Sequence, residues 1–212
     1  MSQASASDIR KDPIMTIVSA PQPTGLEVFA ALGWHVQTGV VQRHGDRDED
    51  PAIFLAAETY DGGEAMLAVI LNPGFATRCG YVIVPVESLR PDLVSLVSRK
   101  SRSGFDGIDG SVPISVHGGV TFATTVDGSD IPSMGYDGPV AVIGFDCAHL
   151  GDGSDFETAK LFNLRYAELI RRQREEPFAH LPLGLVGHAW TTDEVMTECR
   201  RLAEQVVVPR ED

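Results

Sequence analysis

The chain has 212 residues, 43% of them hydrophobic, which is enough for one domain with a sizeable core. It carries 30 acidic and 17 basic residues and a formal charge of −13, which disfavours nucleic acid as a partner. Its three cysteines lack regular spacing, its amino terminus is unlike a signal peptide, and no apolar run could span a membrane. These features predict a cytoplasmic protein.

The first third of the chain predicts a helix followed by a β-hairpin. An apolar stretch at 26–32 predicts the helix, and residues 35–42 predict a strand. Two further strands, at 53–59 and 66–71, flank a Tyr-Asp-Gly-Gly sequence whose glycines suit a tight turn.

The middle of the chain predicts three more strands. Residues 79–86 predict one, and Pro91 suits the first turn of a short helix at 91–98. Residues 113–125 predict a strand interrupted by Gly118-Gly119. The continuous apolar run at 139–145 is typical of a central strand that is buried on both faces.

Two amphipathic helices are predicted to close the chain. Ser154 with Glu157, and Thr191 with Glu194, have the spacing of a capping box at a helix start. The second helix has an apolar stripe at helical spacing, made of Val195, Cys199, Leu202 and Val206. The Pro- and Gly-rich residues 176–190 are expected to connect the two helices along the surface.

These elements predict an α+β fold. We expect a mixed or mostly antiparallel sheet of five or six strands with helices packed on it and two amphipathic helices at the carboxyl end. One domain should cover residues 14–208, between a disordered tail at 1–13 and a carboxyl-terminal tail at 209–212.

Polar residues follow the buried strand without transition. Asp146, Cys147 and His149 come directly after it, and Gly151 and Asp152 lead toward the next helix. Ligands bind at such positions in open sheets, because the strand fixes the side chains while the loop leaves backbone amides free. The amides at the start of the next helix could receive an anion.

A second polar segment contains His117, Gly118, Gly119 and Thr121. Residues without side chains allow a substrate to approach the backbone beside the imidazole. We expect one site in which Cys147, His149, His117 and Asp146 are catalytic and Gly118, Gly119, Thr121, Gly151 and Asp152 bind the ligand. The alternatives are a hydrogen-bonded core histidine at His117 and a small buried hydrophobic residue at Cys147. Trp34 and Trp190 are assigned to the core.

Two mechanisms would use these residues. In the first, His117 or His149 takes the proton of Cys147, whose thiolate attacks the substrate, while Asp146 orients the imidazole. Imidazolium and a helix start would then lower the pKa of the thiol, while the carboxylates of Asp146 and Asp152 would raise it. In the second, Cys147, His149 and His117 bind a catalytic zinc, with Asp152 or Asp146 as the base. Zinc ranks lower because the spacing lacks a strong metal signature, so we expect no cofactor.

The sequence HGGVTF at 117–122, followed by GFDCAHLGD at 144–152, resembles a group of proteins carried by bacteriophages and prophages. Gly80-Tyr81-Val82 and the closing TDEVMTECRRLAEQV are also similar to that group, whereas the chain before residue 75 is not. The group has no assigned reaction. The resemblance therefore implies a phage or prophage accessory protein in a bacterial host and supports the choice of site.

The leading hypothesis is an enzyme, a hydrolase or transferase acting on a small phosphate- or acyl-containing molecule. One alternative is a binding protein that sequesters a small ligand without turnover. A second is a structural or interaction protein whose glycines only make turns. The expected partner is a small molecule, with neither nucleic acid nor membrane, and the sequence leaves the oligomeric state open.

Overall fold

The computed structural model describes residues 26–38, 52–72, 76–97, 114–131, 135–149, 151–162, 164–175 and 187–210. The predicted tail at 1–13, the end of the predicted strand at 35–42, and most of the 176–190 connection lie outside these ranges.

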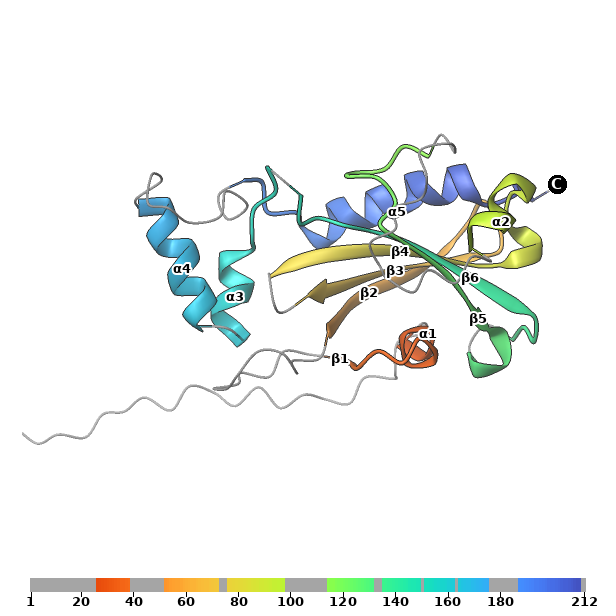
Figure 1. Ribbon diagram of the computed structural model, residues 1–212, viewed down its shortest axis with the longest axis horizontal. Coiled ribbons are helices and arrows are strands. Elements are labelled where there is room, and N and C mark those ends of the chain that lie inside the picture. Colours follow the sequence, from red (N-terminus) through yellow and green to blue (C-terminus); the bar gives the residue numbers. More distant parts are fainter. Residues whose placement is uncertain are drawn as a thin grey trace, which may run out of the picture.

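A six-stranded sheet in the order β1-β2-β3-β4-β6-β5 forms the centre of the molecule (Figure 1). The strands are β1 (Val36–Thr38), β2 (Ala52–Tyr60), β3 (Ala65–Asn72), β4 (Thr77–Pro85), β5 (Phe122–Asp127) and β6 (Pro139–Asp146). Only β1 and β2 are parallel; every other neighbouring pair is antiparallel. The predicted α+β class with a mostly antiparallel sheet is confirmed.

The apolar runs occupy the middle of this sheet, as predicted. The predicted hairpin is β2–β3, which closes where Tyr60 pairs with Ala65. The β6 strand lies between β4 and β5, and each of its residues from Val140 to Phe145 is buried. A strand hydrogen-bonded on both edges and covered on both faces must be apolar throughout, which explains its unbroken run.

The two faces of the sheet have separate cores. Helix α5 (Thr192–Val206) covers one face, where its predicted stripe packs against residues that include Leu67 and Val82. Helix α1 (Leu26–Ala31) covers the other (Figure 1). There, an aromatic cluster of Phe29, Trp34, Tyr81 and Phe122 has ring centroids between 5.1 and 6.0 Å apart. The prediction of Trp34 as a core residue therefore holds.

Helices α3 (Phe156–Phe162) and α4 (Leu164–Glu175) lie beyond one end of the sheet (Figure 1). Their buried residues, including Ala159 and Ile170, pack against Ile53 and Leu71 at the ends of β2 and β3. The single helix predicted after residue 154 is therefore two helices.

The starts of the closing helices are held by side chains. At α5 the predicted capping box of Thr191 and Glu194 is confirmed. At α3 the carboxylate of Asp155 accepts bonds from Thr158 N at 3.0 Å and Thr158 Oγ1 at 2.6 Å. One of the amides predicted as an anion site, that of Thr158, therefore already donates to a carboxylate of the chain itself.

The predicted strand at 113–125 is wrong for its described first part. Residues 114–121 form a turn-containing segment, and β5 begins only at Phe122. Gly118 and Gly119 have φ values of 65° and 84°, which turn the chain out of extended geometry. The helix predicted at 91–98 is a 3-10 turn, η3 (Pro91–Leu93), continued by α2 (Val94–Val97), with proline in the first turn as expected.

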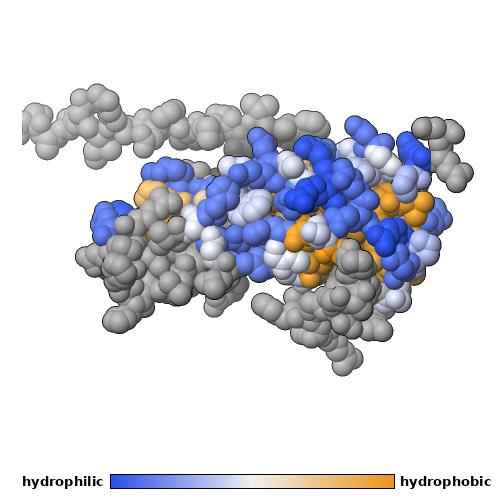
Figure 2. Space-filling view, turned by 90° about the horizontal axis from the view of Figure 1, so that it is seen from above, coloured by the Kyte–Doolittle hydropathy of each residue, from blue (hydrophilic) through white to orange (hydrophobic). Residues whose placement is uncertain are grey.

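The surface seen from the α5 side is mostly hydrophilic, and hydrophobic residues gather toward the end that carries α2 (Figure 2). None of the helices in the described ranges is both long and apolar enough to cross a membrane.

Candidate functional site

The two polar segments meet because β5 and β6 are antiparallel neighbours. Phe122 at the start of β5 pairs with Gly144 near the end of β6, and Thr121 N donates to Gly144 O at 2.9 Å. The segment before β5 therefore lies beside the segment after β6. The rings of His117 and His149 have centroids 5.5 Å apart and are nearly perpendicular. The structure thus brings the two predicted imidazoles together.

Asp152 is the centre of the polar cluster. Its Oδ2 accepts hydrogen bonds from His117 Nε2 at 2.9 Å and from His149 N at 2.8 Å, and its Oδ1 accepts one from Trp190 Nε1 at 2.9 Å. Burial, with 5% of the residue exposed, raises the pKa of the Asp152 carboxyl, but these hydrogen bonds outweigh it and hold the pKa below its usual value. The group is therefore a buried carboxylate, fixed by three segments.

The ring of His149 is held between two carboxylates. Its Nδ1 lies 3.5 Å from Asp152 Oδ2 and 3.8 Å from Asp146 Oδ1. That nitrogen is buried and makes no hydrogen bond within the described part of the chain, although about a third of the side chain is exposed. Asp146 stands at the edge of the cluster, where its Oδ1 also accepts from Ala148 N at 3.0 Å.

The glycines predicted to bind ligand differ from one another. A Cβ at Gly118 would overlap the His149 ring, so this turn passes directly against the imidazole. At Gly119 and Gly151 a Cβ would meet no heavy atom within 4 Å, although both have positive φ. Of these three glycines, only Gly118 lies so close to another group that a Cβ would not fit, and that group is the His149 side chain of the protein itself.

The segment before α5 completes the cluster. A parallel bridge joins Asp152 to His188, and Gly153 N donates to His188 O at 2.8 Å. This pairing places Trp190 over His117, with ring centroids 4.3 Å apart. Trp190 packs against the α5-side core, as expected, but it also donates to the carboxylate, a role that the sequence did not indicate.

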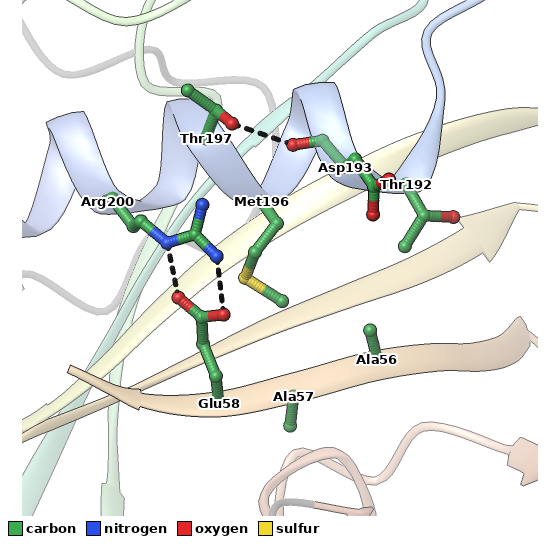
Figure 3. Close-up of a pocket in the computed structure, with 8 residues that line it drawn as sticks. All are labelled: Ala56, Ala57, Glu58, Thr192, Asp193, Met196, Thr197 and Arg200. Carbon is green, nitrogen blue, oxygen red and sulfur yellow. Dashed lines mark hydrogen bonds and ion pairs between the residues drawn. The ribbon is translucent and has the colours of Figure 1, made fainter.

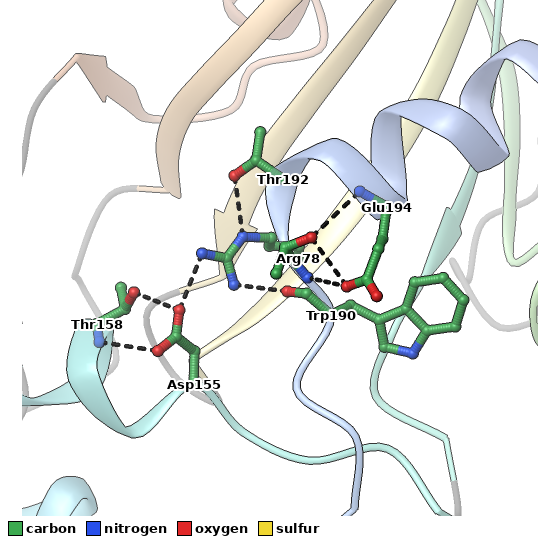
Figure 4. Close-up of polar contacts among 7 residues, drawn as sticks. Arg78, Asp155, Thr158, Trp190, Thr192 and Glu194 are labelled. Atoms are coloured by element: carbon green, nitrogen blue, oxygen red, sulfur yellow. Dashed lines mark hydrogen bonds and ion pairs between the residues drawn. The ribbon is translucent and has the colours of Figure 1, made fainter.

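Arg78, near the start of β4, fixes the segment that leads into α5. Its guanidinium donates to Trp190 O at 2.8 Å, to Thr192 Oγ1 at 3.2 Å and to Asp155 Oδ2 at 2.9 Å (Figure 4). The planar group thus bonds three residues from two parts of the chain at once. Its contact with the carbonyl of Trp190 makes it a second positioning residue that sequence reasoning missed.

Glu198 of α5 holds the loop that contains His117. Its Oε2 accepts from His117 N at 3.2 Å, and its Oε1 accepts from Arg201 at 2.6 Å. Only 9% of Glu198 is exposed. A buried acid on a core-facing helix, one turn after the capping box, was the available sequence signal for this contact.

Cys147 is not at the cluster surface. It is 1% exposed and belongs to the core beneath α5. Burial raises the pKa of the Cys147 thiol, and the nearby carboxylates of Asp152 and Asp146 raise it further, whereas a thiolate nucleophile needs a lowered pKa. Both observations favour the core role for Cys147 over the nucleophile role.

A cavity of about 230 Å³ lies elsewhere, between β2 and the first turns of α5 (Figure 3). Across it, Arg200 and Glu58 form a two-bond ion pair, with both N–O distances 2.6 Å. Neither charge is left for a ligand there, and no histidine lines this cavity. The titratable cluster, which is open to solvent at both imidazoles, is the better candidate for chemistry.

No protein-family model matches the chain, and neither a curated protein nor a solved structure is significantly similar to it. The candidate site therefore rests on geometry alone: two partly exposed imidazoles converge on one buried carboxylate.

Proposed function

We propose that this protein is an enzyme, a hydrolase that acts on a small acyl- or phosphate-containing molecule at the centre formed by His117, His149 and Asp152. The observation that carries the proposal is the 2.9 Å bond between His117 Nε2 and Asp152 Oδ2. A buried carboxylate that orients a solvent-accessible imidazole is the arrangement that general acid–base catalysis requires.

The hydrogen bond decides how the imidazole could act. Since Asp152 is ionised, Nε2 of His117 carries the ring proton and donates it, which leaves a lone pair on Nδ1. Nδ1 can take a proton from water while the resulting hydroxide attacks the acyl carbon. The same proton then passes to the leaving group, and the imidazole is restored. Water is the nucleophile in this scheme because Cys147 is buried.

Local charge favours a neutral acyl substrate when no cation is bound at this centre. Asp146 and Asp152 each have a carboxylate oxygen within 3.8 Å of His149 Nδ1, and the chain as a whole is acidic. A phosphate would be repelled there unless a cation offset these charges.

The test is hydrolysis of p-nitrophenyl acetate and p-nitrophenyl phosphate by the full chain. We expect His117→Gln and Asp152→Asn to lower kcat about 100-fold or more. Because Asp152 acts through the imidazole in this scheme, Asp152→Asn should leave KM nearly unchanged. His35→Gln is the matched control, since His35 is exposed and stands just before β1, at the opposite edge of the sheet from β5. Equal rates for all four proteins would contradict the proposal.

Two other readings share these residues. A sequestering protein would retain a small ligand without turnover. A structural or interaction protein would neither bind nor turn over a small molecule at these residues. The phage or prophage setting is part of the proposal on the strength of the two sequence motifs.

A further inference from the structure

We infer that His117, His149 and Asp152 form a binding site for one divalent transition-metal ion of the zinc class. The inference rests on the proposed function because it concerns the same centre and supplies the cation that a phosphate-containing substrate would need there. It differs from the zinc site considered from the sequence, because a carboxylate takes the place of Cys147.

The three side chains offer the right atoms at the right spacing. One ligand atom from each lies within 4.8 Å of the others. Zinc bonds of about 2.0–2.2 Å put tetrahedral ligands about 3.3 Å apart. The distances from Asp152 Oδ2 to His117 Nε2 and His149 Nδ1 are 2.9 and 3.5 Å, on either side of that value. Small rotations of the partly exposed rings would complete the geometry.

His149 supplies a second, independent observation. Its Nδ1 is buried without a hydrogen bond in the described part of the chain, yet it faces two carboxylate oxygens at 3.5 and 3.8 Å. An imidazole nitrogen in this position gains most from a cation placed between it and the carboxylates. The turn at Gly118 holds the ring there, because its backbone lies against the imidazole.

Supporting bonds leave the ligand atoms oriented. Trp190 Nε1 donates a hydrogen bond to Oδ1 of Asp152, so Oδ2 is the oxygen that faces both imidazoles. The backbone of His117 is held by Glu198. Outer hydrogen bonds of this kind are typical of metal centres, where they orient the ligands and fix their basicity.

The ligand set selects the class of ion. Two imidazoles and one carboxylate suit zinc, cobalt or iron, whereas magnesium and calcium prefer oxygen ligands. A cation would occupy the position of the proton between His117 Nε2 and Asp152 Oδ2, and the ring proton would then lie on Nδ1. Three protein ligands leave a fourth position for water, so a metal-bound water would supply hydroxide in place of the imidazole base.

The experiment is a Co²⁺ titration of the full chain after treatment with a chelator, followed by visible absorption. We expect one Co²⁺ per chain, with tetrahedral absorption bands, displacement by Zn²⁺, and no displacement by excess Mg²⁺. A thiolate charge-transfer band should be absent because Cys147 is not a ligand. His149→Gln should weaken affinity about 100-fold or more, and His35→Gln, far from the cluster, less than about 2-fold.

Several outcomes would overturn the inference: no saturable Co²⁺ or Zn²⁺ binding by the wild type, unchanged affinity in His149→Gln, or displacement by Mg²⁺. If the variant does not fold, nitrogen chemical shifts of the wild-type imidazoles decide, since Zn²⁺ must shift both His117 and His149. Turnover separates the two proposals. Esterase activity that survives chelation but requires His117 would leave the proposed function standing without the metal, whereas metal binding without turnover of either substrate would do the reverse.

Discussion

Replacing Gly118 with alanine should displace the ring of His149, whereas the same change at Gly119 should not. Both glycines have positive φ, at 65° and 84°, so each alanine pays a similar backbone cost of about 1–2 kcal/mol. Only at Gly118 would the new Cβ overlap the imidazole, while at Gly119 it would meet no heavy atom within 4 Å. The pair therefore separates backbone strain from displacement of the ring.

The structure sets the size of the effect. Real Cβ atoms essentially never approach a heavy atom closer than 3.0 Å, so the ring must retreat by about 1 Å. A misplacement of that size costs on the order of 100-fold in a reaction that depends on geometry. Since about a third of the His149 side chain is exposed, it can swing toward solvent, and we expect the two variants to unfold within about 1 kcal/mol of each other.

The assay combines urea unfolding with Co²⁺ affinity and p-nitrophenyl acetate turnover. Gly118→Ala should lose about 100-fold in Co²⁺ affinity, and Gly119→Ala should stay within a few-fold of the wild type. Equal losses in the two variants would show that close approach of the Gly118 turn does not position His149.

Other predictions concern the surroundings of the cluster. In the native protein Cys147 should resist iodoacetamide at neutral pH and react only after unfolding, because it is 1% exposed and burial raises its pKa. Mass spectrometry measures the labelling, and fast labelling of Cys147 in the native protein would support the thiolate mechanism. Arg78→Lys should lower the free energy of unfolding by about 2–3 kcal/mol, because one ammonium cannot replace all three hydrogen bonds of the guanidinium. Arg200→Lys, which changes an exposed ion pair, should cost much less, and similar losses in the two variants would contradict this. Burial raises the pKa of Asp155, but hydrogen bonds from Thr158 and Arg78 outweigh this effect and lower the pKa below 3.8. The ionised carboxylate of Asp155 therefore stabilises the fold fully above about pH 4, and this stabilisation disappears as pH falls through the folded-state pKa. Asp155→Asn should therefore be less stable than the wild type at pH 7, with the difference shrinking in acid; a difference independent of pH would refute this assignment.

Much of the fold follows from local patterns. The hairpin, the central strand β6 and the capped helix α5 each have a periodicity or a turn sequence that depends on few other residues. Residues 114–121 did not follow the prediction because apolar residues on either side of the glycines suggested a strand. The positive φ of both glycines instead makes a turn, which is how His117 reaches Asp152.

The supporting residues of the site could not be found in the same way. Trp190, Arg78 and Glu198 lie between 38 and 114 positions away from most of the groups they bind, and their contacts exist only once the sheet and α5 are assembled. A tryptophan near a Pro- and Gly-rich segment is most simply a core residue, and Trp190 is one. That it also donates to Asp152 follows from the bridge between Asp152 and His188, which no local pattern encodes.

The position of Cys147 shows how the alternation of a strand could have decided a question that composition left open. In β6 the residues facing α5 are Ala141, Ile143 and Phe145, and Cys147 is the next in that series. Val140 and Val142 face the other core, and Asp146 falls in their series. Although β6 ends at Asp146, Cys147 N still donates to Arg78 O at 3.0 Å, so the pairing with β4 carries the cysteine one step further into the core. The chain turns only after that bond, and the turn exposes His149 and leaves the thiol beneath it. A nucleophile at Cys147 would have required the strand to end one residue earlier.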